Sequence, residues 1–373
     1  MIPFSPLFID SDFLLLLKIF NNYKLKKNEI ITYSVRTSIH TYLKIKNYKP
    51  GSKILITSIN IPTIPDIIKY NNLEYIGVDL DLETLDMNKT DFMKKIDNED
   101  IKCCIYSHLF GKINDINWVI NECNKRNIDF IEDCAECYTP KYNGNINSDI
   151  ICFSFGSIKK CTCFGGSKTI FKKKSDFNNF KKEIKKYKYQ YNYEYILKII
   201  KYFYISLLLN NKYLNLFVRK ISYFFNIDIN NKFINLIRNI DNKKLIQNIS
   251  YQPSFLLRKY ILCRINNYKE NNIENENYII KKISTYYVIP GLFANNYNNY
   301  WLYPIYCKNK KEILNRIDSK NINYVNKISQ LVCIDKKCIN SLDIMNNILF
   351  FPIHKLTSLE NIKYIINKLN KCK

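Results

Sequence analysis

Two lysines, Lys159 and Lys160, follow an apolar segment that ends in Ser154. A lysine beside an apolar wall loses its proton more easily, because burial disfavours the charged ammonium, and the neutral amine is a nucleophile for Schiff-base formation. Lys159 has this setting, between Ser154 and the pair Gly165-Gly166. The alternative is that both lysines are solvated loop residues in a chain rich in lysine. Schiff-base chemistry at Lys159 and an ordinary loop are the two interpretations of this segment.

Acidic residues end a second apolar segment, Phe130-Ile-Glu-Asp-Cys-Ala-Glu-Cys137. Open α/β proteins bind ligands at the carboxyl ends of parallel strands, and Asp133 at such an end is placed to hold a pyridinium cation. The alternative for Asp133 is a helix N-cap. Cys134 and Cys137 have the two-residue gap of a metal or redox pair, but no second cysteine pair or histidine follows at ligand spacing. We therefore expect no zinc site.

The elements that must position these residues alternate in type. From Ser34 to about Lys174, short β-branched segments alternate with helical ones, which is typical of βαβ units and a mainly parallel sheet. The expected strands are 53–57, 74–79, 102–106, 129–133 and 149–154, and the expected helices are 65–70, 89–96 and 113–126. This order places Asp133 and Ser154 at the ends of strands.

The chain changes character after this region. Residues 177–226 are dense in Lys, Tyr, Phe, Leu and Ile and show no turn signal before Asn210-Asn211, which predicts two long helices. A polar linker at 269–277, β-like segments at 286–289 and 301–307 and a final helix at 359–371 are expected next. We therefore predict three parts: a large α/β domain over 1–176, a Lys/Tyr-rich helical segment over 177–275 and a small α+β domain over 276–373.

Composition limits the class of protein. The 373 residues carry 57 Lys+Arg and 33 Asp+Glu, a net charge of +24, but the abundance of Asn, Ile, Lys and Tyr indicates a general compositional bias, so the charge is weak evidence for nucleic acid. A hydrophobic content of 47% excludes a disordered chain. The odd number of cysteines, 13, favours reduced thiols. The first residues do not have the pattern of a signal peptide, so a soluble, cytoplasmic protein is expected.

Five sequence blocks occur in a fixed order between Ser34 and Gly166. They are Gly51-Ser-Lys-Ile-Leu-Ile-Thr-Ser58, Gly77-Val-Asp-Leu-Asp-Leu-Glu-Thr-Leu85, Ser107-His-Leu-Phe-Gly111, Ile131-Glu-Asp-Cys-Ala-Glu136 and the step from Ser154 to Lys159. Together they resemble the sugar aminotransferases of the DegT/DnrJ/EryC1/StrS family. The rest of the chain is similar more loosely, through Gln252-Pro-Ser254 and Trp301-Leu-Tyr-Pro304. The resemblance implies a fold-type-I pyridoxal-phosphate-dependent transferase, an α/β protein with a mainly parallel central sheet flanked by helices and a smaller α+β C-terminal domain.

The resemblance also implies roles for individual residues. Lys159 falls on the lysine that holds pyridoxal 5'-phosphate as a Schiff base, and Ser154 on the serine that contacts the cofactor phosphate. Asp133 falls on the carboxylate that faces the pyridine nitrogen, where an ionised group keeps the ring protonated and electron-withdrawing. Arg36 and Thr37 fall at the start of the first helix, where the family's backbone amides receive the phosphate.

Three positions depart from the family pattern. Glu136 stands where the family usually has Gln against the phenolic oxygen of the cofactor, and a second carboxylate would repel that oxyanion unless it is protonated or turned away. Val35 and Arg36 replace small residues at the phosphate-binding turn. Ile61 stands where many relatives place an aromatic ring over the cofactor.

The activity that the resemblance implies is ping-pong transamination. Lys159 acts as base and acid while an amino group passes from an amino acid, usually glutamate in the family, to a keto sugar that is usually nucleotide-linked. Lysine at this position, where cofactor-dependent dehydratases have histidine, favours transamination. A homodimer is implied as well. The competing hypothesis is a non-catalytic or degenerate member, a basic protein that binds nucleic acid or an anionic membrane surface; elimination or desulfuration is a third, and no cysteine is identified on a catalytic loop to support it.

The remaining candidates have more ordinary interpretations. The basic, aromatic stretch 187–226 is either an amphipathic surface that rests on a membrane or part of a core or subunit interface. Nucleic acid is not expected as the main partner. His40 and His354 lack a partner pattern and are expected to be structural, whereas the role of His108 stays open.

Overall fold

The computed structural model describes residues 12–225, 244–270, 273–283, 285–292, 302–316, 330–352 and 357–371. Of the residues discussed above, Trp301 and His354 lie outside these ranges.

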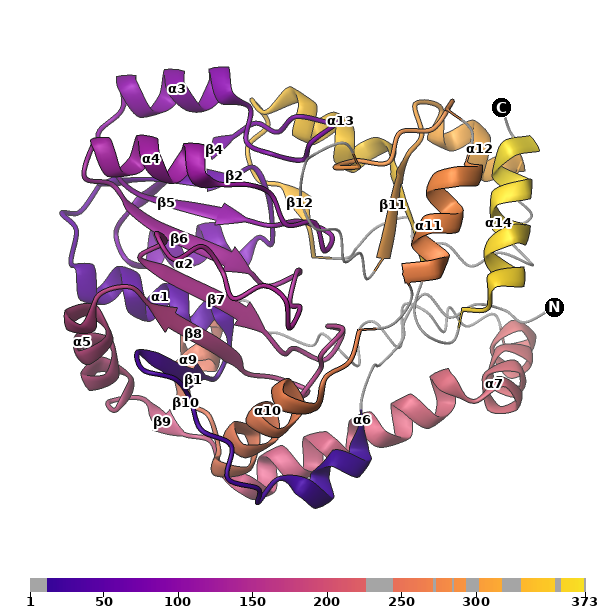
Figure 1. Cartoon of the computed structure of the whole chain (residues 1–373), viewed down its shortest axis with the longest axis horizontal. Helices are drawn as coiled ribbons and strands as arrows, with labels where there is room; N and C mark the ends of the chain where they lie inside the picture. Colours follow the sequence, from indigo (N-terminus) through magenta and orange to yellow (C-terminus); the bar gives the residue numbers. More distant parts are fainter. Residues whose placement is uncertain are drawn as a thin grey trace.

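A seven-stranded sheet forms the centre of the fold, in the order β1-β8-β7-β6-β5-β2-β4 (Figure 1). Its strands are β1 (Glu29–Thr32), β2 (Lys53–Thr57), β4 (Glu74–Val78), β5 (Ile101–Ser107), β6 (Asp129–Cys134), β7 (Ile150–Ser154) and β8 (Ser167–Phe171). Neighbouring strands pair in parallel along the series β4, β2, β5, β6 and β7. Strand β8 runs antiparallel to both of its neighbours, β7 and β1. Each strand that the sequence predicted in this region is confirmed, with its ends within one residue of the expected ones.

Helices cover both faces of this sheet, because side chains along each strand alternate between two apolar cores. One core lies under α1 (Val35–Lys46), α2 (Thr63–Tyr70), α5 (Lys174–Ile184) and α9 (Leu245–Ile249). On the opposite face lie α3 (Lys89–Asn98) and α4 (Asn117–Lys125), followed toward β7 by η1 (Phe13–Lys18), α6 (Asn192–Asn210) and α10 (Phe255–Asn267). The molecule is therefore a three-layer α/β/α structure around a mainly parallel sheet.

All three predicted helices in this region differ from expectation at their ends, and α3 continues two residues beyond the expected 89–96. The helix expected over 113–126 begins only at Asn117, where Asp115 Oδ1 accepts the N–H of Asn117 at 3.1 Å. The residues before it form a loop that leaves the end of β5 and passes through Phe110, whose φ of 57° lies in the left-handed region. The helix expected over 65–70 begins at Thr63. The loop after β5 is thus available to contact the carboxyl edge of the sheet.

The basic region after β8 forms three helices rather than the two predicted. The first, α5, ends at Ile184, and residues Lys188–Tyr189 then pair as β9 with β10 (Tyr251–Gln252). Gln252 Nε2 holds this turn by donating to the carbonyl oxygen of Tyr187 at 2.9 Å. The break at Asn210-Asn211 is confirmed, since α6 ends there and α7 (Lys212–Phe224) follows.

Most of the C-terminal elements lie on the right of Figure 1, on the side toward which the parallel strands point, and α13 and β12 lie near its upper centre. They are α11 (Ile273–Lys282), β11 (Leu302–Tyr306), α12 (Lys310–Arg316), β12 (Val332–Cys333), α13 (Ile339–Asn347), β13 (Ile348–Pro352) and α14 (Leu359–Lys371). The final helix is confirmed, but the linker expected over 269–277 is wrong in its second half, because α11 begins at Ile273.

These C-terminal elements pack directly on the α/β part. Strand β12 pairs with β3 (Ile59–Asn60), and Ser341 Oγ lies 2.6 Å from Ser58 Oγ. The rings of Phe110 and Phe350 lie 5.1 Å apart within one shared apolar core. The division into parts at 176 and 275 stays a prediction.

Exposed apolar side chains gather on α6, α7 and η1. The exposed fractions are 62% for Leu197 on α6, 63% for Phe217 on α7 and 84% for Leu17 on η1. The η1 segment lies against α6 in Figure 1, where the rings of Phe13 and Phe203 meet at 5.2 Å. Within the described ranges, no helix combines the length and the apolar character needed to cross a membrane.

Candidate active site

Ser107 and Ser154 are the last residues of β5 and β7, and Asp133 is the last but one of β6, the parallel strand between them. Ser107 lies opposite Asp133 in the sheet, and Cys152, two residues before Ser154, lies opposite Asp133 on the other side. Because side chains alternate along a strand, all three polar side chains point to the face covered by α1. The carboxyl edge of the sheet thus collects two hydroxyls and a carboxylate.

Asp133 is a buried carboxylate with fixed partners. Only 6% of the residue is exposed, and its oxygens accept hydrogen bonds from Ser107 Oγ at 3.2 Å and from the N–H of Ala135 at 2.9 Å. Burial raises the pKa of Asp133 to about 6, against the opposing effects of the Ala135 N–H and the positive charge of Lys159. The residues after Asp133 form a turn, so the N-cap interpretation is wrong.

Lys159 lies in the turn after β7 and faces the same edge. Its N–H donates to the carbonyl oxygen of Gly156 at 3.0 Å, and Nζ donates to Glu136 Oε1 at 3.4 Å. Only 18% of the Lys159 side chain and 12% of the Glu136 side chain are exposed. The interpretation of Lys159 as a solvated loop lysine is therefore wrong.

Glu136 connects Lys159 to the loop after β5. Its second oxygen, Oε2, accepts the N–H of Phe110 at 2.9 Å. The left-handed conformation of Phe110 turns this N–H toward the carboxylate. The site therefore contains two carboxylates, Asp133 and Glu136, and one amine.

Ser154 lies where a loop of glycines meets the start of α1. Ser154 Oγ accepts the N–H of Gly156 at 3.3 Å, so its own proton can be donated to a ligand. The N–H of Gly166 donates to the carbonyl oxygen of Tyr33 at 3.0 Å, and the N–H of Phe155 donates to the carbonyl oxygen of Gly166 at 3.0 Å. These bonds hold the beginning of α1 beside the end of β7.

The two residues expected at the start of α1 are oriented differently from each other. Thr37 is fully buried, and its hydroxyl donates to the carbonyl oxygen of Ile249 at 2.7 Å, while its N–H donates to the capping oxygen of Ser34 at 3.1 Å. Arg36 is half-buried, and burial lowers its pKa while the neighbouring Tyr33 opposes that shift. The Thr37 side chain is thus committed to the interior, and Arg36 is the residue of this pair that lies at the edge.

Ile61 follows β3 and is half-buried, where it packs against two of the apolar cores. Its N–H donates to Asn60 Oδ1 at 2.9 Å, and Asn60 Nδ2 donates to Ser107 Oγ at 3.0 Å. A chain of hydrogen bonds thus runs from Asn60 through Ser107 to Asp133. Sequence reasoning missed Asn60 and Ser107, although Ser107 begins one of the blocks quoted above.

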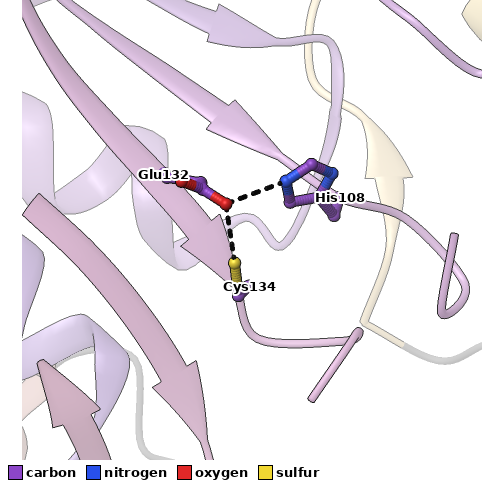
Figure 2. Close-up of side chains that lie close together, drawn as sticks. All are labelled: His108, Glu132 and Cys134. Carbon is purple, nitrogen blue, oxygen red and sulfur yellow. Dashed lines mark hydrogen bonds and ion pairs between the residues drawn. The ribbon is translucent and has the colours of Figure 1, made fainter. Parts of the chain in front are cut away.

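Behind Asp133, on the opposite face of β6, lies a fully buried polar cluster of His108, Glu132 and Cys134 (Figure 2). Glu132 Oε1 accepts hydrogen bonds from His108 Nε2 at 3.2 Å and from Cys134 Sγ at 3.3 Å. His108 Nδ1 accepts the N–H of Asn114 at 3.2 Å, which assigns the ring proton to Nε2. The three atoms that could bind a metal, a histidine nitrogen, a carboxylate oxygen and a thiol sulfur, lie within 4.8 Å of one another. Each of them already has a hydrogen-bond partner in the protein.

Glu132 also receives hydrogen bonds from outside the trio. They come from the Tyr142 hydroxyl at 2.6 Å, the N–H of Asn145 at 2.8 Å and the Ser148 hydroxyl at 2.7 Å. Burial opposes ionisation of Glu132, but the hydrogen bonds from His108, Tyr142 and Asn145 outweigh it and lower the pKa to about 2. The cluster is therefore a satisfied buried anion that supports β6 from behind, which answers the question left open for His108.

His40 has the structural setting that the sequence predicted. It is 3% exposed on α1, and its Nδ1 lies 3.1 Å from Asn71 Nδ2. Burial, with help from the charge of Lys44, lowers the pKa of His40 to about 4, so the ring is neutral at physiological pH.

Comparison with known proteins identifies this architecture. Residues 16–177 match the model of the DegT/DnrJ/EryC1/StrS aminotransferase family. GDP-perosamine synthase of Escherichia coli O157:H7 is 31% identical over 133 residues, which are 36% of this chain and 35% of that enzyme. The chain thus matches only about a third of the length of this curated relative.

Solved structures resemble the chain over nearly its whole length. The sugar aminotransferase Spr1654 of Streptococcus pneumoniae, in its PMP-form, has a TM-score of 0.66 at 12% identity and covers 100% of this chain and 99% of its own. The aminotransferase TlmJ of Streptoalloteichus hindustanus has a TM-score of 0.66 at 11% identity, over 96% of this chain and 89% of its own. The fold is that of the fold-type-I transferases, and the match to the DegT/DnrJ/EryC1/StrS aminotransferase family model lies in the part of the chain that carries the central sheet.

Proposed function

We propose that this protein is a pyridoxal-phosphate-dependent aminotransferase that moves an amino group from an amino acid, with glutamate as the expected donor, to a nucleotide-linked keto sugar. The observation that carries the proposal is the placement of the Lys159 amine, paired with Glu136, at the carboxyl edge of a mainly parallel sheet where the buried carboxylate of Asp133 also lies. The family model that matches residues 16–177 and the names of the similar proteins support the same reaction class.

The side chains at this edge fit the cofactor. Asp133 is a buried anion whose raised pKa reflects poor solvation, and a protonated ring nitrogen would compensate that charge. When bound, pyridoxal phosphate supplies an aldehyde and an electron-withdrawing ring. Ser154 Oγ can donate its proton to the phosphate, since it accepts rather than donates in its bond with Gly156.

Lys159 has two tasks in this proposal. Its Nζ would hold the cofactor, and as a free amine it would take a proton from the α-carbon of the amino donor and later give a proton back. Glu136 accepts a hydrogen bond from the same nitrogen and orients it. Asp133 holds the positive charge at the ring nitrogen while Lys159 moves the proton.

Trapping with sodium borohydride tests the role of Lys159, because reduction makes the link between a lysine and pyridoxal phosphate permanent. We expect a mass increase on the peptide that contains Lys159 in the wild type and in the Lys160→Ala control, and none in Lys159→Ala. Equal labelling of Lys159→Ala and the control would contradict the proposal. A screen of nucleotide keto sugars for glutamate-dependent amination then identifies the acceptor.

We further propose a cytoplasmic homodimer. Large apolar side chains exposed on α6, α7 and η1 are the type of surface that a partner covers, and the described cysteines, which form no disulfides with one another, suit a reducing compartment. Light scattering on the eluting protein measures the oligomeric state. Co-sedimentation with anionic liposomes tests the membrane alternative for residues 187–226, which recovery only in the supernatant would exclude.

The second candidate function is a basic binding protein without catalysis. The net charge of +24 and the apolar face of α6 and α7 are the observations that favour it. Absorbance separates the two candidates: protein that turns yellow on addition of pyridoxal phosphate supports the enzyme, and protein that stays colourless supports the binding protein.

A further inference from the structure

Lys198 reaches the candidate active site from α6, a helix beyond the residues matched to the family model. Its Nζ lies so close to Gly165 that a Cβ built on this glycine would stand 3.2 Å away. Gly165 belongs to the loop that follows Lys159, and its N–H donates to the carbonyl oxygen of Phe155 at 3.0 Å. A lysine from the helical region thus lies near the end of β7.

Arg36 approaches the same loop from α1. The hydrogen bond from Gly166 to Tyr33 holds the start of α1 against the loop, and Arg36 is close enough for its charge to act on Lys198. Burial, followed by the charges of Arg36 and Lys201, lowers the pKa of Lys198 to about 8. Two half-buried cations, Lys198 beside Gly165 and Arg36 at the start of α1, therefore lie on either side of the Gly165-Gly166 loop.

Neither cation has a counter-ion among the residues that the structure describes. No ion pair or hydrogen bond from Arg36 or Lys198 to a carboxylate is formed within these ranges. Glu194, one turn before Lys198 on α6, accepts instead the N–H of Tyr191 at 3.0 Å. Other partly buried lysines are paired: Lys46 with Asp129 at 2.8 Å and Lys168 with Glu29 at 3.4 Å.

We infer that Arg36 and Lys198 together bind a phosphoryl group at the edge of the candidate active site. Two like charges that are partly buried without a counter-ion cost free energy, and a dianion between them removes that cost. A phosphoryl group has the charge and the acceptor oxygens that a guanidinium and an ammonium bind. The inference rests on the proposed function only for the source of the phosphoryl group, which is either the cofactor phosphate or the diphosphate of the sugar nucleotide.

Direct binding of inorganic phosphate, measured by calorimetry at pH 7, tests the site without any turnover. We expect Lys198→Gln to weaken phosphate binding about tenfold, as loss of one charge-assisted contact predicts. Lys198→Arg keeps the charge and should keep most of the affinity. The matched control is Lys188→Ala, which removes an exposed lysine just before α6 and should bind phosphate as the wild type does. Circular dichroism of each variant checks that it is folded.

Two further titrations identify the source. If the cofactor phosphate occupies the site, Lys198→Gln reduces the preference for pyridoxal phosphate over pyridoxal and leaves the affinity for UDP and GDP unchanged. If the nucleotide diphosphate occupies it, the affinity for UDP or GDP falls and the cofactor preference is unchanged. Equal phosphate affinity in the wild type, Lys198→Gln and Lys188→Ala, or no phosphate binding by the wild type, overturns the inference. Borohydride labelling of Lys159 would still stand in that case, so the two proposals fail separately.

Discussion

Glu136 and Lys159 form an ion pair in the candidate site, with Nζ of the lysine donating to Oε1 of the carboxylate at 3.4 Å. The other oxygen of Glu136 is held by the N–H of Phe110. Both side chains are largely covered, so the pair is only partly screened by solvent. The amine that we propose to attack the cofactor therefore has an anionic partner in place of the amide that the family usually has at this position.

Glu136→Gln should slow cofactor attachment. The carboxylate accepts hydrogen bonds from Lys159 Nζ and from the Phe110 N–H at once, whereas glutamine has one acceptor oxygen and an NH₂ group that cannot accept from the other donor. We expect pyridoxal phosphate attachment, followed by its absorbance, to become about tenfold slower, as loss of one charge-assisted contact predicts. Glu122→Gln on α4 makes the same change far from the site and should attach the cofactor at the wild-type rate. An unchanged rate in Glu136→Gln would show that the pair does not position the amine.

Asp133→Asn should make folding less sensitive to pH. The pKa of Asp133 is raised from its ordinary 3.8 to about 6, so the folded protein disfavours the charged form, and its stability falls as pH rises from about 4 to about 6. A shift of this size corresponds to about 3 kcal/mol. Asparagine retains the oxygen that accepts the Ala135 N–H and carries no charge.

Urea unfolding of the wild type and Asp133→Asn at pH 4, 5, 6 and 7 measures this effect. The variant should gain stability relative to the wild type over the interval from pH 4 to 6 and keep a constant difference above it. A difference that does not change with pH would mean that Asp133 ionises as freely in the folded protein as in the unfolded chain.

The sequence predicted the strands of the sheet well because each is a short β-branched segment between turns, as in Lys53–Thr57. It missed β1 and also β8, in which three consecutive polar residues, Ser167, Lys168 and Thr169, follow the Gly165-Gly166 pair. Strand β8 can be identified only from its pairing in the structure, where it lies between β1 and β7.

The site was predictable where a residue ends a strand and unpredictable where a contact joins distant segments. Asp133, Ser154 and Lys159 follow apolar segments, which brings them to one edge in any parallel sheet. Lys198 looks like any other lysine of a basic helix, and only the packing of α6 on the Gly165 loop singles it out. From the sequence, Glu132 would be placed in solvent, as a charged residue in a strand whose side chains alternate between the two faces of the sheet. In the structure its carboxylate is fully buried.

Glu132→Gln should destabilise the protein strongly at neutral pH. The carboxylate accepts from five donors, and a glutamine would replace one acceptor oxygen with an NH₂ group that faces the donors of its partners. We expect a loss of about 3 kcal/mol in the free energy of unfolding at pH 7. The pKa of Glu132 is lowered to about 2, so this contribution is present above pH 4.5 and lost as the pH falls toward 2. The difference between wild type and variant in urea unfolding should shrink over that interval, and a difference that persists at pH 2 would contradict the charge-based account.

Sulfate binding should report the titration of Lys198, because sulfate keeps its charge of −2 throughout the range in which this lysine changes charge. The pKa of Lys198 is lowered to about 8, so below pH 8 the group is charged and above it the unliganded protein must take up a proton to bind the anion. We expect sulfate affinity to be level between pH 6.5 and 7.5 and to fall, by up to about tenfold per unit, above pH 8. Two other groups around the site belong to the α1 side: Arg36 stays charged over this range, and the pKa of Tyr33 is raised above 10. The remaining two, Lys201 and Glu194, lie on α6 itself. Lys198→Arg, which does not lose its charge below pH 10, should give a flat profile, and a profile that falls equally in this variant would assign the titration to a group other than Lys198.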